Sequence, residues 1–288
     1  MSEAPPPPFP TAGDDAGRER AIRPAPELRE MALIGGLAFF LHLSAGTILQ
    51  WLNFRWGLLA SQILFIATPP VLAVRWFYLD RRATLGLYRP HGSALGAALL
   101  GVAGLNWLLT LAGEWQERVF PTPEPLRQFF EDLLVYRGAA DFTGLLLVLA
   151  VVPGVCEEVL FRGFMQTGLV RVMGGAGRGV VVSALLFAAF HLDPWRFAGV
   201  FVLGLFLGLL VVRSGSLWPA VAGHALNNLL SIVVAAVGGE DVPSPPGDAV
   251  PGGLTGILVA TTLLGLGLWI LRRAPPPAAS DAGVTRML

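Results

Sequence analysis

Residues 142–166 read FTGLLLVLAVVPGVCEEVLFRGFMQ. Outside the group EEVLFR (157–162) this stretch is apolar except for the uncharged Thr143 and Gln166. As an α-helix it is long enough to cross the roughly 30 Å hydrocarbon core of a bilayer. Ionisable groups inside such a segment are costly unless they are paired or hydrated, so each is a candidate for a functional site. The stretch therefore predicts a transmembrane helix that carries functional polar groups.

The rest of the chain has the same character. Its 288 residues are 54% hydrophobic and 14% charged, whereas about a quarter of the residues of an ordinary soluble domain are charged. Long apolar runs alternate with short charged segments, which is typical of a polytopic membrane protein. We expect an all-α membrane protein with an intramembrane polar cavity and about eight transmembrane helices, at residues 31–51, 56–79, 94–112, 142–166, 179–192, 197–213, 217–237 and 253–271.

Two features inside these runs bear on packing. Pro69 and Pro70 should kink the second run, because proline removes a backbone donor and its ring clashes with the preceding turn. Gly204 and Gly208 should let the sixth run approach a neighbour closely. The fifth run is short for a full span.

Proline-rich ends and the apolar runs between them suggest how the chain is divided. Residues 1–30 and 274–288 are rich in proline and poor in apolar residues, so we expect disordered tails. Between the tails we expect N-terminal transmembrane helices with an acidic loop, a central segment with the polar groups, and a loop with the last helix, at 31–141, 142–237 and 238–273.

Arginine placement predicts the orientation in the membrane. The loop that follows the second run contains Arg81, Arg82 and Arg89, whereas the long loop 113–141 on the other side is acidic. By the positive-inside rule both termini should be cytoplasmic, and the composition suggests the inner (cell) membrane of a bacterium. Loop 113–141 is also suited to an interfacial helix by its aromatic residues Trp115, Phe120, Phe129 and Phe130.

The first polar cluster is EEVLFR. Glu158 and Arg162 are four residues apart on one helical face, in the orientation that favours an ion pair. Glu157 points about 100° away and needs another partner. A helix-end salt bridge would explain Glu158 and leave Glu157 unexplained.

Two further clusters are FAAFH (187–191) and HALNN (224–228). Phe187 lies one turn before His191 and can support it, while His224 and Asn228 share one face. Each cluster alone is compatible with simple packing or interhelical hydrogen bonding. Under the predicted topology, however, Glu157, His191, His224 and Asn228 lie roughly 13, 18, 10 and 16 Å from the cytoplasmic boundary. A shared internal site explains this coincidence.

Such a site can hydrolyse a peptide bond. A carboxylate and a neutral imidazole can deprotonate and orient water, and a second histidine with an amide can stabilise an oxyanion. Glu157, His191 and His224 could alternatively bind zinc, but the HExxH pattern is absent and we expect no cofactor. Cys156 is expected to be a packing residue rather than a nucleophile.

The motifs EExxxR, FxxxH and HxxxN, in this order on successive membrane helices, resemble those of the CPBP family of intramembrane proteases. This family is also called the CAAX protease and bacteriocin-processing, or abortive-infection, family, and includes the type II CAAX prenyl endopeptidase. The resemblance makes 142–237 a catalytic core. It implies that Glu157 and His191 activate water, that His224 and Asn228 stabilise the oxyanion, and that Glu158 and Arg162 support them.

The sequence thus favours a CAAX-type intramembrane endopeptidase. Its expected partners are the bilayer and a peptide or protein substrate that reaches the site from the membrane or cytoplasmic side. Formal net charge is zero, so no basic surface suggests nucleic acid. The alternatives are a non-catalytic immunity or scaffold protein, and a small-solute transporter that uses the same buried charges as a relay.

Overall fold

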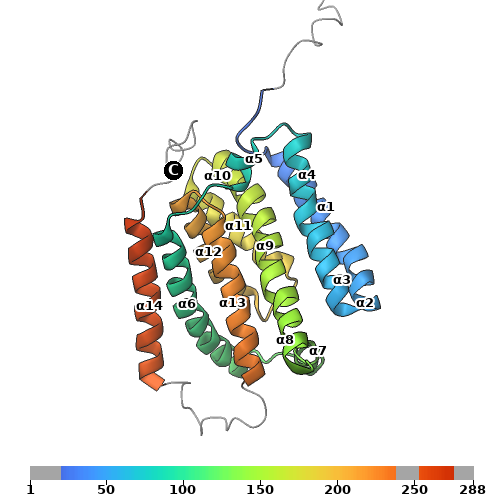
Figure 1. Ribbon diagram of the computed structural model, residues 1–288, viewed down its shortest axis with the longest axis vertical. Helices are drawn as coiled ribbons and strands as arrows, with labels where there is room; N and C mark the ends of the chain where they lie inside the picture. Colours follow the sequence, from blue (N-terminus) through green and yellow to red (C-terminus); the bar gives the residue numbers. More distant parts are fainter. Residues whose placement is uncertain (1–20, 238–252, 276–288) are drawn as a thin grey trace, which may run out of the picture.

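The computed structural model describes residues 21–237 and 253–275. Over these two ranges every regular element is a helix, and the helices stand side by side in one bundle (Figure 1). Seven helical segments are long and apolar enough to cross a membrane: Leu28–Leu52, Phe54–Trp76, Gly92–Val119, Gly138–Val172, Phe197–Ser214, Trp218–Ala236 and Gly253–Arg273. The fifth expected run, at 179–192, corresponds to α11 (Ala176–Phe190), which is apolar but shorter, as its sequence indicated.

Several spans are built from consecutive helical pieces. The first joins α1 (Leu28–Leu41), η1 (His42–Gly46) and α2 (Thr47–Leu52), and the second joins α3 (Phe54–Ser61), η2 (Gln62–Ala67) and α4 (Thr68–Trp76). The fourth comprises α8 (Gly138–Leu146), η3 (Leu147–Val151), α9 (Val152–Glu158), η4 (Val159–Met165) and α10 (Gln166–Val172). The remaining elements are α5 (Arg81–Leu85), α6 (Gly92–Val119), α7 (Glu124–Leu133), α12 (Phe197–Ser214), α13 (Trp218–Val237) and α14 (Gly253–Arg273).

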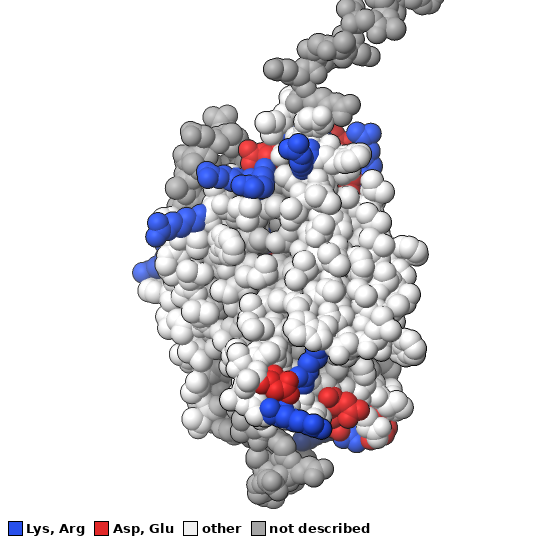
Figure 2. Space-filling model, turned by 45° about the vertical axis from the view of Figure 1, so that its right-hand side comes forward, with Lys and Arg blue, Asp and Glu red and all other residues white. Residues whose placement is uncertain are grey.

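The bundle has two parts. Helices α14, α6, α13 and α9 follow one another across it, each packed against the next, while the hairpin α1–α4 lies at one edge (Figure 1). This hairpin meets the rest of the bundle where η2 packs against α9. Charged side chains gather at the two ends and leave an uncharged belt between them (Figure 2), as expected for a protein whose middle lies in hydrocarbon.

All four η elements are π-helical turns, and two of them end two residues before a proline. Instead of breaking at Pro69 and Pro70, the second span widens over Gln62–Ala67 and continues as α4. Pro153 likewise follows η3. A π-turn accommodates the missing proline N–H, and such turns are common at functional sites. Both of these turns lie in the two spans that meet at η2 and α9.

The glycines of α12 permit the close approach that their spacing predicted. A Cβ on Gly204 would lie 3.1 Å from the Ala184 Cβ and 3.2 Å from Arg162 Nη2. The carbonyl oxygens of Gly204 and Gly208 accept hydrogen bonds from Arg162 (3.3 Å) and Gln166 (3.1 Å). The small residues therefore expose backbone acceptors to two buried polar side chains of the fourth span.

Replacing Gly204 by leucine is expected to destabilise the protein by about 1–3 kcal/mol, the usual cost of overpacking. The matched control is Gly199→Leu on the same helix, where a Cβ would have no neighbour within 4 Å. SDS titration in mixed micelles measures both variants against wild type. Equal stability of the two variants would show that close packing at Gly204 is unimportant.

One predicted boundary is wrong. Residues 21–30 were expected to belong to the disordered tail, but α1 begins at Leu28 and Glu30 is 4% exposed. Arg23 donates to Glu30 at 2.6 Å and to the Phe77 carbonyl oxygen at 3.1 Å. The hydrogen bond and charge of Glu30, with a smaller contribution from Glu27, hold the pKa of the Arg23 guanidinium above its usual value. These polar contacts replace the apolar burial that the segment lacks. The predicted tails at residues 1–20 and 276–288, and the loop 238–252, lie outside the described residues.

The acidic loop does contain a helix, as its aromatic residues suggested. Helix α7 lies at the opposite end of the bundle from the start of α1 (Figure 1). Its Phe129 ring packs edge-on against Phe54 at 5.7 Å, and Arg196 lies 3.3 Å from the centre of the Phe130 ring. The helix therefore joins the tip of the hairpin α1–α4 to the turn that follows His191.

Candidate active site

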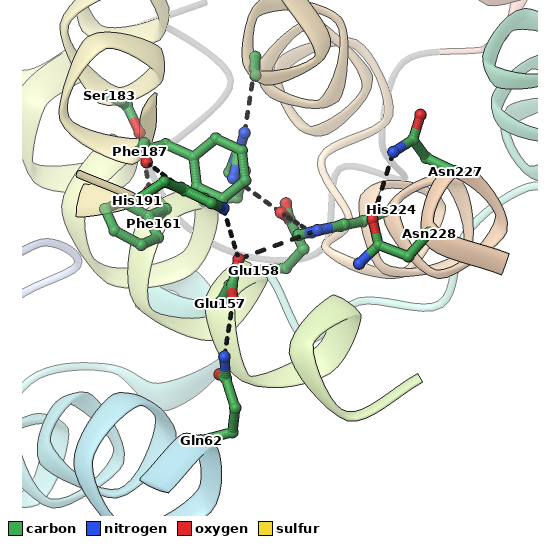
Figure 3. Close-up of polar contacts among 12 residues, drawn as sticks. Gln62, Glu157, Glu158, Phe161, Ser183, Phe187, His191, His224, Asn227 and Asn228 are labelled. Atoms are coloured by element: carbon green, nitrogen blue, oxygen red, sulfur yellow. Dashed lines mark hydrogen bonds and ion pairs between the residues drawn. The ribbon is translucent and has the colours of Figure 1, made fainter. Parts of the chain in front are cut away.

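The site is centred on Glu157, near the C-terminal end of α9. Its carboxylate points toward side chains of three other spans (Figure 3). Glu157 Oε2 lies 3.9 Å from His191 Nε2 and 3.9 Å from His224 Nε2, while Oε1 accepts a hydrogen bond of 2.8 Å from Gln62 Nε2. The predicted convergence of Glu157 with the two histidines is therefore present.

His191 caps the C-terminal end of α11 and is oriented by that helix. Its Nδ1 lies 2.8 Å from the Phe187 carbonyl oxygen. A carbonyl oxygen can only accept, so Nδ1 carries the proton, and Nε2 of the neutral ring presents a lone pair to the site. The predicted support by Phe187 includes ring contact as well, with centroids 4.9 Å apart.

His224 is oriented by the neighbouring carboxylate of the fourth span. Its Nδ1 lies 2.9 Å from Glu158 Oε1, and the same oxygen accepts a hydrogen bond of 2.7 Å from Arg162 Nη1. Glu158 and Arg162 are fully buried, so the predicted i, i+4 ion pair is present. The structure adds that Glu158 uses this pair to hold His224 as well, a contact between segments far apart in the chain.

Phe187 lies between these groups. Its ring is 5.5 Å from the His224 ring, and the Arg162 guanidinium carbon stands 4.1 Å above its centre. With 1% of its surface exposed, Phe187 packs against both imidazoles inside the bundle and lets Arg162 stack on an aromatic face.

Asn228 lies one turn beyond His224 on α13. Its Nδ2 donates a hydrogen bond of 3.4 Å to the Leu149 carbonyl oxygen, and its Oδ1 accepts a hydrogen bond of 3.3 Å from Asn227 Nδ2. Pro153 lacks the N–H that would otherwise bond to the Leu149 carbonyl four residues earlier. The proline therefore leaves an acceptor that turns the Asn228 amide nitrogen toward η3, the turn before α9.

Asn227 is itself held from α6. The Nδ2 group of Asn106, a residue with 7% exposure, lies 3.1 Å from both Asn227 Oδ1 and Ser231 Oγ. Because Asn227 Oδ1 accepts from Asn106, its Nδ2 is the end that faces Asn228. A chain of amides from α6 thus fixes the orientation of Asn228.

The three donors Glu157, His191 and His224 were the alternative zinc ligands. Zinc sites require donors at roughly 2.0–2.2 Å from the metal, and the described part of the chain contains no group of three His, Cys, Asp or Glu residues placed to hold a metal ion. That the protein needs no cofactor stays a prediction.

Cys156 is buried at 5% exposure in the apolar cluster between the fourth span and the hairpin α1–α4. It packs with Leu160 and Phe161 in that cluster, and among the described residues its thiol has no hydrogen-bonded histidine. The interpretation of Cys156 as a packing residue is consistent with this position.

Access to the site is uneven. The side chain of His191 is 34% exposed, against 14% for Glu157 and 4% for His224. A pocket of about 630 Å³ on the outer side of Phe161 and Phe190 is lined by apolar residues alone and does not include Glu157. The expected intramembrane polar cavity stays a prediction. The two pockets on the described part of the chain are lined by other residues than Glu157, His191 and His224.

Sequence reasoning missed two residues of the first two spans. Gln62 contacts Glu157 directly, and His42 on η1 contacts Ser61 and lies 6.2 Å from the Phe190 ring. A search for ionisable groups passes over Gln62 because its amide is neutral, and His42 stands without a recognisable motif. Polar residues of any kind inside apolar runs would have been the useful signal.

Residues 139–230 match the family model described as type II CAAX prenyl endopeptidase Rce1-like. The chain carries an Rce1-like domain. The match confirms the resemblance seen in the motifs, and the Rce1-like domain contains Glu157, His191, His224 and Asn228 but not Gln62 or His42. With this domain and its seven apolar spans, the chain is an integral multi-pass membrane protein. No curated protein and no solved structure matches the chain.

Proposed function

We propose that the protein is an intramembrane endopeptidase that cleaves its substrate by direct attack of water. The observation that supports this most strongly is the convergence on Glu157 Oε2 of two imidazole Nε2 atoms, each at 3.9 Å. Oε2 is buried and accepts no hydrogen bond from the described residues, so it is free to bind the proton of a substrate water.

The first step places water between Glu157 and His191. One water proton passes to Glu157 Oε2 while the other is held by the lone pair of His191 Nε2, and the water oxygen bonds to the carbonyl carbon. The carbonyl π bond breaks and yields a tetrahedral oxyanion. When the C–N bond breaks, Glu157 returns its proton to the departing amine, so the carboxylate is regenerated.

The oxyanion requires hydrogen-bond donors. Asn228 Nδ2 supplies one, and His224 supplies another when Nε2 is also protonated. His224 Nδ1 is engaged by Glu158 Oε1 at 2.9 Å, so Nε2 is the ring nitrogen that can face the oxyanion.

The substrate class follows from the family and the location. We propose a membrane-associated or C-terminally processed peptide or protein, such as a pheromone or bacteriocin precursor, which approaches past the exposed edge of His191. We also propose a bacterial cell membrane with both termini in the cytoplasm. No metal ion takes part in the proposed steps.

The test uses purified protein in proteoliposomes and quenched fluorescent peptides that end in a Cys-aliphatic-aliphatic-X sequence, with and without a farnesyl group. Mass spectrometry of protein termini in membranes of expressing cells extends the search to natural substrates. We expect cleavage by wild type that persists in EDTA and is absent from the Glu157→Gln variant. Loss in EDTA with recovery on adding zinc would refute the metal-free mechanism, and pH-dependent solute uptake without new termini would favour a transporter.

A further inference from the structure

Gln62 is a buried glutamine in the middle of an apolar span. Only 5% of its surface is exposed, and its Nε2 donates to Glu157 Oε1 at 2.8 Å. An ionised carboxylate has no proton to donate, so the amide nitrogen is the end of Gln62 that faces it. This is the one hydrogen bond that the carboxylate of Glu157 accepts within residues 21–237 and 253–275.

The bond divides the two carboxylate oxygens between two tasks. Oε1 is occupied by Gln62, and Oε2 is left facing His191 and His224 (Figure 3). Rotation of the carboxylate about its last side-chain torsion would exchange the two oxygens, because that torsion is broad and roughly two-fold. A donor on one oxygen opposes the rotation and keeps the other oxygen directed at the water.

The hairpin α1–α4 holds Gln62 at the required depth. Next to it, Ser61 is fully buried and its Oγ lies 2.7 Å from His42 Nδ1. The backbones of the two spans approach closely there, since a Cβ on Gly46 would lie 2.5 Å from Ser61 Oγ. Gln62 is also the first residue of the π-turn η2, which packs against α9.

Packing alone does not account for a glutamine at this position. Its Oε1 is buried and accepts no hydrogen bond from the described residues. A buried polar atom without a partner destabilises a protein by about 1–3 kcal/mol, and an apolar side chain of the same length would avoid that cost. The interaction that offsets this loss of stability must come from the amide nitrogen, which donates to Glu157.

We propose that Gln62 is a positioning residue, which orients the Glu157 carboxylate for water activation from outside the Rce1-like domain. The inference rests on the proposed function, since it gives Gln62 a role through Glu157. It follows that the domain at 139–230 does not form a complete active site by itself, and that the hairpin α1–α4 contributes to catalysis.

The test replaces Gln62 by methionine, which has a similar length and no N–H group. We expect kcat to fall about 10- to 100-fold, the scale of loss caused by small misplacement of a catalytic group, with KM unchanged. The matched control is Gln166→Met. Gln166 is also a buried glutamine with an unpartnered Oε1, but it donates to the Gly208 carbonyl oxygen instead of Glu157. Its variant should keep the wild-type kcat.

A double-mutant cycle separates positioning from a general structural effect. In Glu157→Asp the carboxylate is drawn back from Gln62 by one methylene, so adding Gln62→Met should cause no further loss of kcat. The assay uses whichever quenched peptide wild type cleaves fastest, in proteoliposomes. An unchanged kcat in Gln62→Met, or an equal loss in the Glu157→Asp background, would overturn the inference. If Glu157→Gln still cleaves, the proposed function itself fails.

Discussion

Replacing Glu157 by glutamine is expected to lower the cleavage rate roughly 10²- to 10⁴-fold, the usual contribution of a general base. The amide cannot accept the proton that leaves the attacking water. Its carbonyl oxygen can still accept the hydrogen bond from Gln62, so the contact between α9 and η2 should survive. Initial rates in proteoliposomes measure the loss, and SDS titration should show an unchanged unfolding midpoint.

The control for this prediction is Cys156→Ala, one residue away in the same turn of α9. Cys156 packs in an apolar cluster, so its removal should cost some stability and leave the cleavage rate within a few-fold of wild type. If Cys156→Ala abolished cleavage while Glu157→Gln remained active, the cysteine would be a nucleophile and the water mechanism would be wrong.

The contacts that the sequence predicted well are local ones. The pair Glu158–Arg162 and the support of His191 by Phe187 both join residues four apart, and α-helical geometry brings such residues together regardless of the rest of the fold. The spans were also predictable, because length and apolar composition alone determine them. The residues at which the spans begin and end were less predictable, as the start of α1 at Leu28 shows.

The missed contacts join distant parts of the chain. Gln62 of the second span meets Glu157 of the fourth span, with the third span between them in the sequence, and Asn106 reaches Asn227 from α6. Periodicity along one helix carries no information about which helix lies opposite. Depth in the membrane did narrow the choice, since residues at the same depth can meet, and it correctly grouped Glu157 with both histidines.

Proline and glycine explain how these polar groups are accommodated. Pro153 frees the Leu149 carbonyl for Asn228, while Gly204 and Gly208 expose carbonyls to Arg162 and Gln166. In hydrocarbon no water is available to satisfy such groups. The backbone acceptors released by these residues therefore take the place of solvent around the site.

Replacing Arg162 by methionine is expected to destabilise the protein by about 3–5 kcal/mol, the cost of breaking a buried ion pair. The Glu158 carboxylate is fully buried and would keep only His224 as a partner. Arg162 also donates to Gly204 and stacks on Phe187, so three spans lose a shared contact. SDS titration measures the loss.

The matched control is Arg127→Met on α7. Arg127 forms the same kind of i, i+4 pair with Glu131 at 2.7 Å, but both side chains are more than half exposed, and solvent-exposed pairs contribute little. The stability of the Arg127→Met variant should therefore not differ measurably from wild type.

The double variant Glu158→Gln/Arg162→Met should recover much of the stability lost in Arg162→Met, because no uncompensated charge remains buried. It should not recover cleavage, because the His224 ring then faces a neutral amide instead of the carboxylate that orients it. Full activity in the double variant would show that the charge of Glu158 is not needed at His224.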